Sequence, residues 1–240
     1  MSDQKIRFES DAKLVDTLGQ QLIPNNGVGL SELVKNSYDA DASIVEIHLG
    51  AAFEEDLSKS YILIKDDGEG MSFEDLEEKF FTIAHEHGRR EKTPKGRIPV
   101  GEKGIGRFAV QRLGKRLLLF TKKRGGPEYK VEVDWERFTP GTKLGEVELV
   151  VQSDHEKEFE ENGFGTILLI ANLRERFDGK TLAHLKREVN VLISPFAQTK
   201  DFQINLKVPE DKEHLSSAKL GTAAFARQSH FQFKGQLDKT

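Results

Sequence analysis

The chain has 240 residues, of which 37% are apolar and 32% are charged, and this composition permits a sizeable core. Its formal net charge at pH 7 is −4, which argues against a strongly basic nucleic-acid-binding surface. The absence of cysteine excludes disulfides, thiol nucleophiles and thiolate zinc sites. No apolar run approaches the roughly 18 residues of a membrane span, and the N-terminus lacks signal-peptide character, so we expect a cytoplasmic protein without a membrane partner.

The periodicity of apolar residues predicts a mixture of helices and strands. Residues 11–22 and 30–39 carry apolar side chains at helical spacing, and residues 182–192 do so again before Pro195. Successive strands are close enough along the chain for hairpins, which predicts an α+β fold. The predicted strands are residues 43–49, 61–65, 116–121, 129–133, 146–152, 166–171 and 202–208.

The first motif lies in the second predicted helix and reads Glu32-Leu-Val-Lys-Asn36-Ser-Tyr-Asp39-Ala. Because Glu32, Asn36 and Asp39 are spaced by four and three residues, they form one polar stripe on a helix. A carboxylate there can orient and deprotonate a water for attack on a terminal phosphate, and a neighbouring amide oxygen can bind Mg²⁺. The same stripe is also typical of the solvated face of an ordinary amphipathic helix.

The second motif, Asp66-Asp-Gly68-Glu-Gly70-Met71, follows the predicted strand at residues 61–65. Asp66 could accept a hydrogen bond from the exocyclic amine of adenine, whereas guanine would present a carbonyl oxygen to the same carboxylate. Gly68 and Gly70 allow a tight turn, and Gly70 would let a flat base approach the backbone. An ordinary turn between strands is the alternative, since Asp-Gly pairs are common there.

The third motif, Gly101-Glu-Lys-Gly104-Ile-Gly106, precedes a helical pattern at residues 107–113. Glycines before a helix expose backbone N–H groups to an anion, and Lys103 adds a positive charge. The motif is not a Walker loop, because no Ser or Thr follows the lysine. It is not a dinucleotide fingerprint either, because no strand precedes it.

The order and spacing of the three motifs resemble the N, G1 and G2 boxes of the GHKL superfamily of ATPases. This superfamily includes the B subunit of DNA gyrase, the MutL proteins, the ninety-kilodalton heat-shock chaperones, the MORC proteins and the histidine kinases. A fourth element, Gly165-Thr166 before a predicted strand, is similar to the late Gly-Thr strand of the superfamily. The resemblance covers roughly residues 6–208 and implies a two-layer α/β sandwich with a mostly antiparallel sheet covered by helices.

The resemblance also implies roles for individual residues. Glu32 corresponds to the general base, Asn36 to the magnesium ligand and Asp66 to the acid that binds adenine. Asp39 closes the first box in a supporting role, and the hydroxyl of Thr166 helps to hold the adenine-binding acid and a water. The implied ligands are ATP and Mg²⁺. The remaining nucleotide-binding positions are Gly68, Gly70, Met71, Gly101, Glu102, Lys103, Gly104, Ile105 and Gly106.

The domain organisation is expected to be one ATP-binding domain over residues 1–208, followed at residues 209–240 by a linker and the start of a further domain. Residues 81–106 combine glycines, prolines and dense positive charge, which suits a mobile lid over a polyanion. Within this lid, His85 and His87 lack further residues at metal-ligand spacing, so we do not favour a metal pair. We expect the chain to be the N-terminal part of a longer protein.

The function implied is slow, Mg²⁺-dependent ATP hydrolysis that couples nucleotide state to lid closure and to a nucleotide-dependent homodimer. A downstream domain of the same protein is a further expected partner, and the sequence does not identify the client, whether DNA or protein. One alternative is a histidine-kinase-type catalytic domain, which the lack of a phospho-acceptor helix before the first box and the presence of Lys103 argue against. The other is a nucleotide sensor without turnover, which Glu32 argues against.

Overall fold

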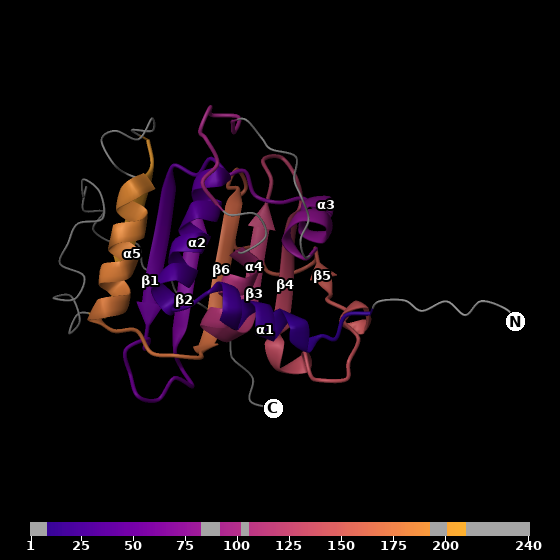
Figure 1. Cartoon of the computed structure of the whole chain (residues 1–240). Helices are drawn as coiled ribbons and strands as arrows, with labels where there is room; N and C mark the ends of the chain where they lie inside the picture. The colour runs from indigo at the N-terminus through magenta and orange to yellow at the C-terminus, as the bar shows by residue number, and fades with distance from the viewer. Residues whose placement is uncertain (1–8, 83–91, 102–105, 193–200, 210–240) are drawn as a thin grey trace, which may run out of the picture.

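The computed structural model describes residues 9–82, 92–101, 106–192 and 201–209, whose strands form a single seven-stranded sheet in the order β5-β4-β3-β6-β2-β1-β7 (Figure 1). Every neighbouring pair is antiparallel except β1 and β7, which are parallel. The expected α+β fold with a mostly antiparallel sheet is confirmed. The strands are β1 (Ile44–Gly50), β2 (Tyr61–Asp66), β3 (Gly114–Lys122), β4 (Glu128–Asp134), β5 (Val151–Gln152), β6 (Gly165–Leu173) and β7 (Gln203–Lys207).

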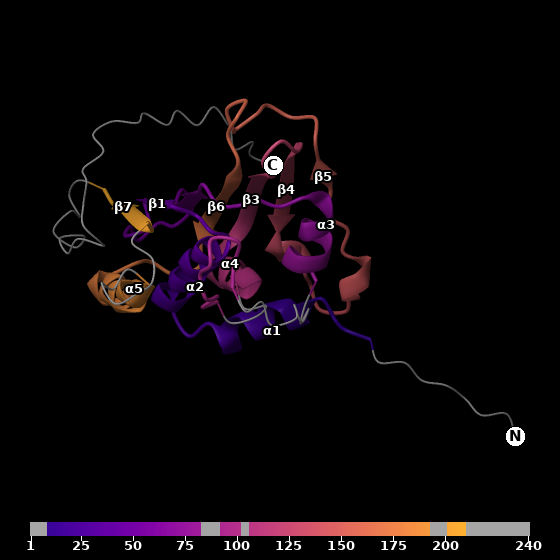
Figure 2. The same ribbon diagram turned by 90° about the horizontal axis from the view of Figure 1, so that it is seen from above.

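Four longer helices cover one face of the sheet and complete the two-layer arrangement (Figure 2). They are α1 (Lys13–Leu22), α2 (Asn26–Asp39), α4 (Gly106–Leu113) and α5 (Gly179–Leu192). Helix α2 packs between α4 and α5, which places the first motif at the centre of the helical layer. Shorter helical segments are α3 (Phe73–Asp75), the π-helical η1 (Leu76–Phe80), and the 3₁₀ turns η2 (Trp135–Arg137) and η3 (Leu144–Glu146).

The main core lies between the sheet and the helices, because alternate strand residues and one side of each helix are apolar. In β1, for example, Val45, Ile47 and Leu49 are buried against the helical layer, while the residues between them point to the other face. A smaller cluster on that other face contains Leu63, Phe120, Phe159 and Ile167. The sheet is therefore apolar on both faces near its centre.

Two sequence predictions of secondary structure need correction. The strand expected at residues 146–152 is reduced to Val151–Gln152, because its first residues form a turn: the amides of Glu146 and Val147 donate to the carbonyls of Lys143 and Leu144 at η3. The helix expected from residue 30 begins at Asn26, because the side chain of Asn25 accepts a hydrogen bond from the amide of Val28 and caps it. Helical residues 73–80 were not predicted.

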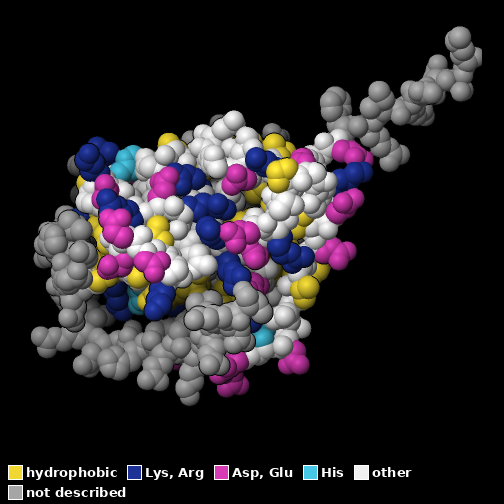
Figure 3. All heavy atoms as spheres, turned by 90° about the horizontal axis from the view of Figure 1, so that it is seen from below, with side chains coloured by type: hydrophobic (Ala, Val, Ile, Leu, Met, Phe, Trp, Pro, Cys, Tyr) yellow, Lys and Arg dark blue, Asp and Glu magenta, His cyan; other side chains and the backbone are white. Residues whose placement is uncertain are grey.

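The surface of the described residues carries charges of both signs. On the face shown in Figure 3, their lysine and arginine side chains are interspersed with aspartates and glutamates. This face therefore has no continuous basic stripe of the kind that follows a nucleic-acid backbone. Within the described ranges, no helix has the length and apolar character needed to cross a membrane.

Candidate functional site

Helix α2 presents the first motif to three different surroundings. The side chain of Glu32 is buried, that of Asn36 is exposed and that of Asp39 is half-buried. Lys35 Nζ lies 2.7 Å from Oε1 of Glu32. The other carboxylate oxygen, Oε2, is buried and has no hydrogen-bond partner among the described residues. An oxygen in this condition can accept a hydrogen bond from a water or a ligand.

Asp66 ends β2 in a closed hydrogen-bond network. Ser37 donates its hydroxyl proton to Oδ2 at 2.8 Å, and the backbone amides of Gly68 and Thr166 donate to Oδ1 at 3.0 and 3.2 Å. Burial raises the pKa of Asp66 to about 6, although these hydrogen bonds act in the opposite direction. The sequence analysis did not identify Ser37 as a site residue. Its position four residues after Leu33 could have indicated that it lies on the buried side of α2.

Thr166 meets Asp66 through its backbone and not through its hydroxyl. The hydroxyl lies 3.3 Å from that of Thr121, which donates to the carbonyl of Gly165 and accepts from the amide of Met71. Thr121 is fully buried and joins the second motif to the Gly-Thr element. Nothing in the sequence around Thr121 distinguishes it from an ordinary strand residue, so only the tertiary structure reveals this link.

The glycines of the second motif are required by close packing of the protein itself. Gly70 has a φ of +65°, and a Cβ there would lie 2.1 Å from the carbonyl oxygen of Lys122. A Cβ on Gly68 would lie 2.8 Å from the carbonyl oxygen of Ala40. The side of Gly70 on which a Cβ would project is thus filled by β3, and the approach of a flat base to its backbone stays a prediction.

Asp39 connects the first motif to the third. Its carboxylate accepts hydrogen bonds from the amides of Val100 and Gly101, both at 2.9 Å. A Cβ on Gly101 would lie 2.8 Å from Oδ2 of Asp39 and 3.5 Å from Oδ1 of Asn36. Burial raises the pKa of Asp39, while the two amides lower it. Gly106 is the first residue of α4, and Glu102, Lys103, Gly104 and Ile105 lie outside the described residues.

Residues 92–101 are the described part of the expected lid, together with residues 81 and 82; residues 83–91, with His85 and His87, lie outside the described residues. Arg97 anchors this segment, since its side chain is fully buried. Its guanidinium donates to the carbonyl of Tyr38 at 3.1 Å and to Asp201 at 3.3 Å. The guanidinium also stacks over the rings of Tyr38 and Phe202.

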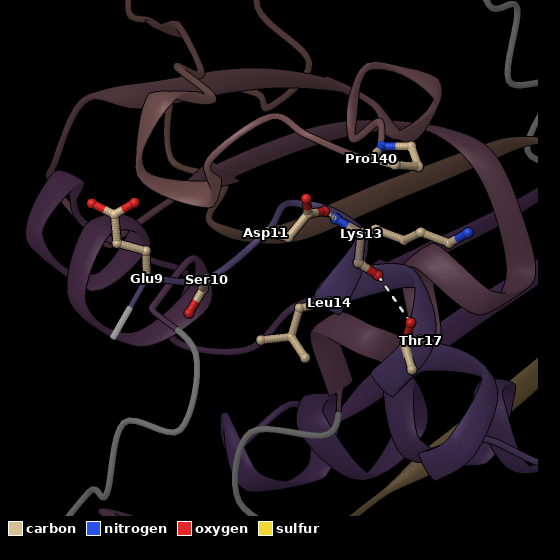
Figure 4. A pocket seen from close by; sticks show the side chains of 7 residues that line it. All are labelled: Glu9, Ser10, Asp11, Lys13, Leu14, Thr17 and Pro140. Carbon is tan, nitrogen blue, oxygen red and sulfur yellow. Dashed lines mark hydrogen bonds between the residues drawn. The ribbon is translucent and has the colours of Figure 1, made fainter. Parts of the chain in front are cut away.

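A cavity of about 450 Å³ lies apart from these residues, where the start of α1 meets Pro140 (Figure 4). Two of its polar side chains have protein partners: Asp11 accepts from the amides of Lys13 and Gly141, and the Thr17 hydroxyl donates to the carbonyl of Lys13. We assign this cavity no ligand. It is lined by Glu9, Ser10, Asp11, Lys13, Leu14, Thr17 and Pro140.

Residues 26–166 match the family described as histidine kinase-, DNA gyrase B-, and HSP90-like ATPase. The match includes more than half of the chain, so this chain belongs to that family. The resemblance to the GHKL superfamily is thereby confirmed. Membership of the family supports ATP as the ligand of the site built by α2, Asp66 and Gly101.

Individual relatives match between 53% and 59% of the chain. The chaperone protein HtpG of Geobacter metallireducens is 30% identical in an alignment of 156 positions that covers 57% of this chain and 24% of that protein. A putative type II restriction enzyme, HgiDII, of Herpetosiphon aurantiacus is 32% identical in an alignment of 130 positions that covers 53% of this chain and 20% of the enzyme. HtpG of Geobacter sulfurreducens is 28% identical in an alignment of 162 positions that covers 59% of this chain and 25% of that protein. The chain spans a quarter or less of these relatives.

Proposed function

We propose that this chain is the ATP-hydrolysing domain of a longer protein and that Glu32 is its general base. The observation that carries the proposal is the buried Oε2 of Glu32, which has no partner among the described residues. Asn36 lies one helical turn further along α2 and beside Gly101, where the phosphates would approach. The proposed base and metal ligand are thus one turn apart on α2, and the backbone proposed to bind the phosphates lies beside them at Gly101.

The proposed reaction uses these groups without any covalent enzyme intermediate. Asp66 accepts a hydrogen bond from the adenine amine, and the Asn36 amide oxygen takes one position on Mg²⁺. Bound Mg²⁺ would neutralise charge on the phosphate oxygens. Glu32 takes a proton from a water whose oxygen bonds to the γ-phosphorus, while the bond from phosphorus to the β–γ bridging oxygen breaks and ADP leaves.

The roles of the lid and of partners extend this proposal. Asp39 ties the amides of Val100 and Gly101 to α2, so a change in the phosphates near Asn36 would reach the end of the lid through two hydrogen bonds. We propose that nucleotide binding closes the lid and promotes a homodimer, and that a downstream domain acts on the client. The matched relatives, a chaperone and a putative restriction enzyme, have different names, so the client is left open between protein and DNA.

A nucleotide sensor without turnover is the second candidate. It is favoured by the ion pair that holds one oxygen of Glu32 to Lys35, because a restrained carboxylate could fail to act as a base. An ATPase and a sensor without turnover would bind ATP equally well. Hydrolysis must therefore be measured separately from binding.

The deciding experiment compares the full chain with Glu32→Ala by calorimetric titration with Mg²⁺-ATP and by phosphate release. We expect similar affinities and a loss of turnover of about 100-fold or more, because a general base acts only on the attacking water. Equal turnover by both proteins would reject Glu32 as the base. ATP binding without Glu32-dependent turnover would support the sensor.

A further inference from the structure

Glu32 has one carboxylate oxygen that is held and one that is free. Lys35 Nζ contacts Oε1 at 2.7 Å, whereas Oε2 is buried without a partner among the described residues. A general base must present one oxygen to the attacking water and must not rotate that oxygen away. The carboxylate is a rigid plane, so the position of one oxygen constrains the position of the other. A contact that fixes Oε1 therefore also keeps Oε2 from rotating away.

We propose that Lys35 is a positioning residue for ATP hydrolysis: it holds Oε1 of Glu32 so that Oε2 faces the attacking water. This inference rests on the proposed function. Lys35 itself does not touch the water or the phosphate in this proposal. Its part is to set the direction of the Glu32 carboxylate and to balance its charge.

The surroundings distinguish this pair from an ordinary ion pair on a helix surface. Pairs three residues apart are common on helices and contribute little when both partners are solvated. Here the side chains of Lys35 and Glu32 are only 18% and 8% exposed. A carboxylate buried to this degree needs a counter-charge, and Lys35 is the group found beside it. The contact is therefore in place before any nucleotide binds.

Lys35 also has a second carboxylate within reach, which provides a control. Glu188 on α5 lies 3.9 Å away through its Oε2, but its side chain is 40% exposed. At this distance and exposure the contact is a weak ion pair and not a hydrogen bond. If Lys35 served mainly to join α2 to α5, then Glu188→Gln would have the same effect as loss of the lysine. If Lys35 acts on Glu32, then Glu188→Gln should be nearly silent.

The test measures kcat and KM for Mg²⁺-ATP on the full chain and four variants. Lys35→Met should lose kcat about tenfold or more, with KM nearly unchanged, because substrate contacts are intact. Lys35→Arg should recover most of kcat, since it keeps a positive donor beside Oε1. Glu188→Gln and the charge-matched control Lys59→Met, in the turn before β2, should resemble the parent chain. Thermal unfolding of each variant shows whether it is folded.

The outcomes separate this inference from the function on which it rests. Unchanged or higher kcat in Lys35→Met, with normal Glu32-dependent turnover in the parent chain, would overturn the inference alone. A rise in KM without loss of kcat, or an equal loss in Glu188→Gln, would also overturn it. Absence of Glu32-dependent turnover in the parent chain would overturn both. If Lys35→Met unfolds, the comparison of Lys35→Arg with Glu188→Gln still decides, because an inactive Arg variant that is folded contradicts the proposal.

Discussion

Ser37 donates a hydrogen bond of 2.8 Å to Oδ2 of Asp66, and this contact joins the helix of the first motif to the strand end of the second. The two residues are 29 positions apart in the sequence. Because Ser37 directly follows Asn36, the helix places the proposed metal ligand and the partner of the adenine acid on adjacent residues. In the proposed site, α2 would therefore fix the positions of the adenine and the phosphates relative to one another.

Replacing Asp66 by Asn should weaken ATP binding while leaving the fold intact. The amide oxygen can still accept from the amides of Gly68 and Thr166, and its NH₂ group can donate to Ser37, so the internal network survives. With that network satisfied, an amide is a poorer acceptor for the adenine amine than a carboxylate is. We expect a loss of about 1–3 kcal/mol of binding free energy, measured by calorimetry. Equal affinities for ATP and GTP in the parent chain would argue against Asp66 as the adenine reader.

The raised pKa of Asp66 predicts a specific dependence of stability on pH. The pKa of this group is about 6 in the folded chain and 3.8 in the reference state, so the folded chain binds more protons between these values. This one residue therefore makes the chain more stable as the pH falls from about 6 toward 4. Urea unfolding of the parent chain and Asp66→Asn should show the parent gaining stability relative to the variant over this range. A difference in unfolding free energy that stays constant between pH 6 and pH 4 would contradict the raised pKa of Asp66.

Gly70→Ala should destabilise the chain by more than backbone strain alone. Both Gly70 and Gly125 have positive φ, but a Cβ on Gly125 meets nothing within 4 Å, whereas one on Gly70 would strike the carbonyl of Lys122. Gly125→Ala should therefore cost about 1 kcal/mol from strain, and Gly70→Ala about 2 kcal/mol or more. Chemical denaturation measures both. Equal costs would show that β3 moves aside readily.

Asp39→Ala should release the segment that ends at Gly101 without unfolding the domain. The variant loses the acceptor of the Val100 and Gly101 amides, so we expect faster cleavage by trypsin between residues 92 and 107 and weaker ATP binding. Asp39→Asn retains one acceptor oxygen, so its cleavage rate and its ATP affinity should lie between those of the parent chain and Asp39→Ala. Unchanged cleavage in Asp39→Ala would show that the other contacts of this segment, made by Arg97 and by Lys95 with Asp41, are sufficient to hold it.

The sequence predicted the fold class and most elements, because strands such as β6 and helices such as α5 have strong local periodicity. It failed at residues 146–152, where the apolar pattern suits a strand but the amides of Glu146 and Val147 close a 3₁₀ turn with the carbonyls of Lys143 and Leu144. The motif spacing predicted which acids and amides share α2. It could not reveal Ser37 or Thr121 as partners, because their contacts depend on which atoms the tertiary structure brings together. The spacing of Glu32 and Lys35 allows an ion pair on any helix, and only the structure shows that this pair is buried. The catalytic and ligand roles stay predictions.

The burial of Arg97 has a consequence for how short the chain can be made. Its guanidinium is enclosed by α2 on one side and by Asp201 and Phe202 on the other. A chain that ended at the end of α5, before Asp201, would expose the guanidinium of Arg97. It would also lack β7, which pairs in parallel with β1. Such a truncation would damage the base of the lid although it deletes none of the four sequence motifs. The functional unit must therefore extend beyond the last motif at least as far as the end of β7.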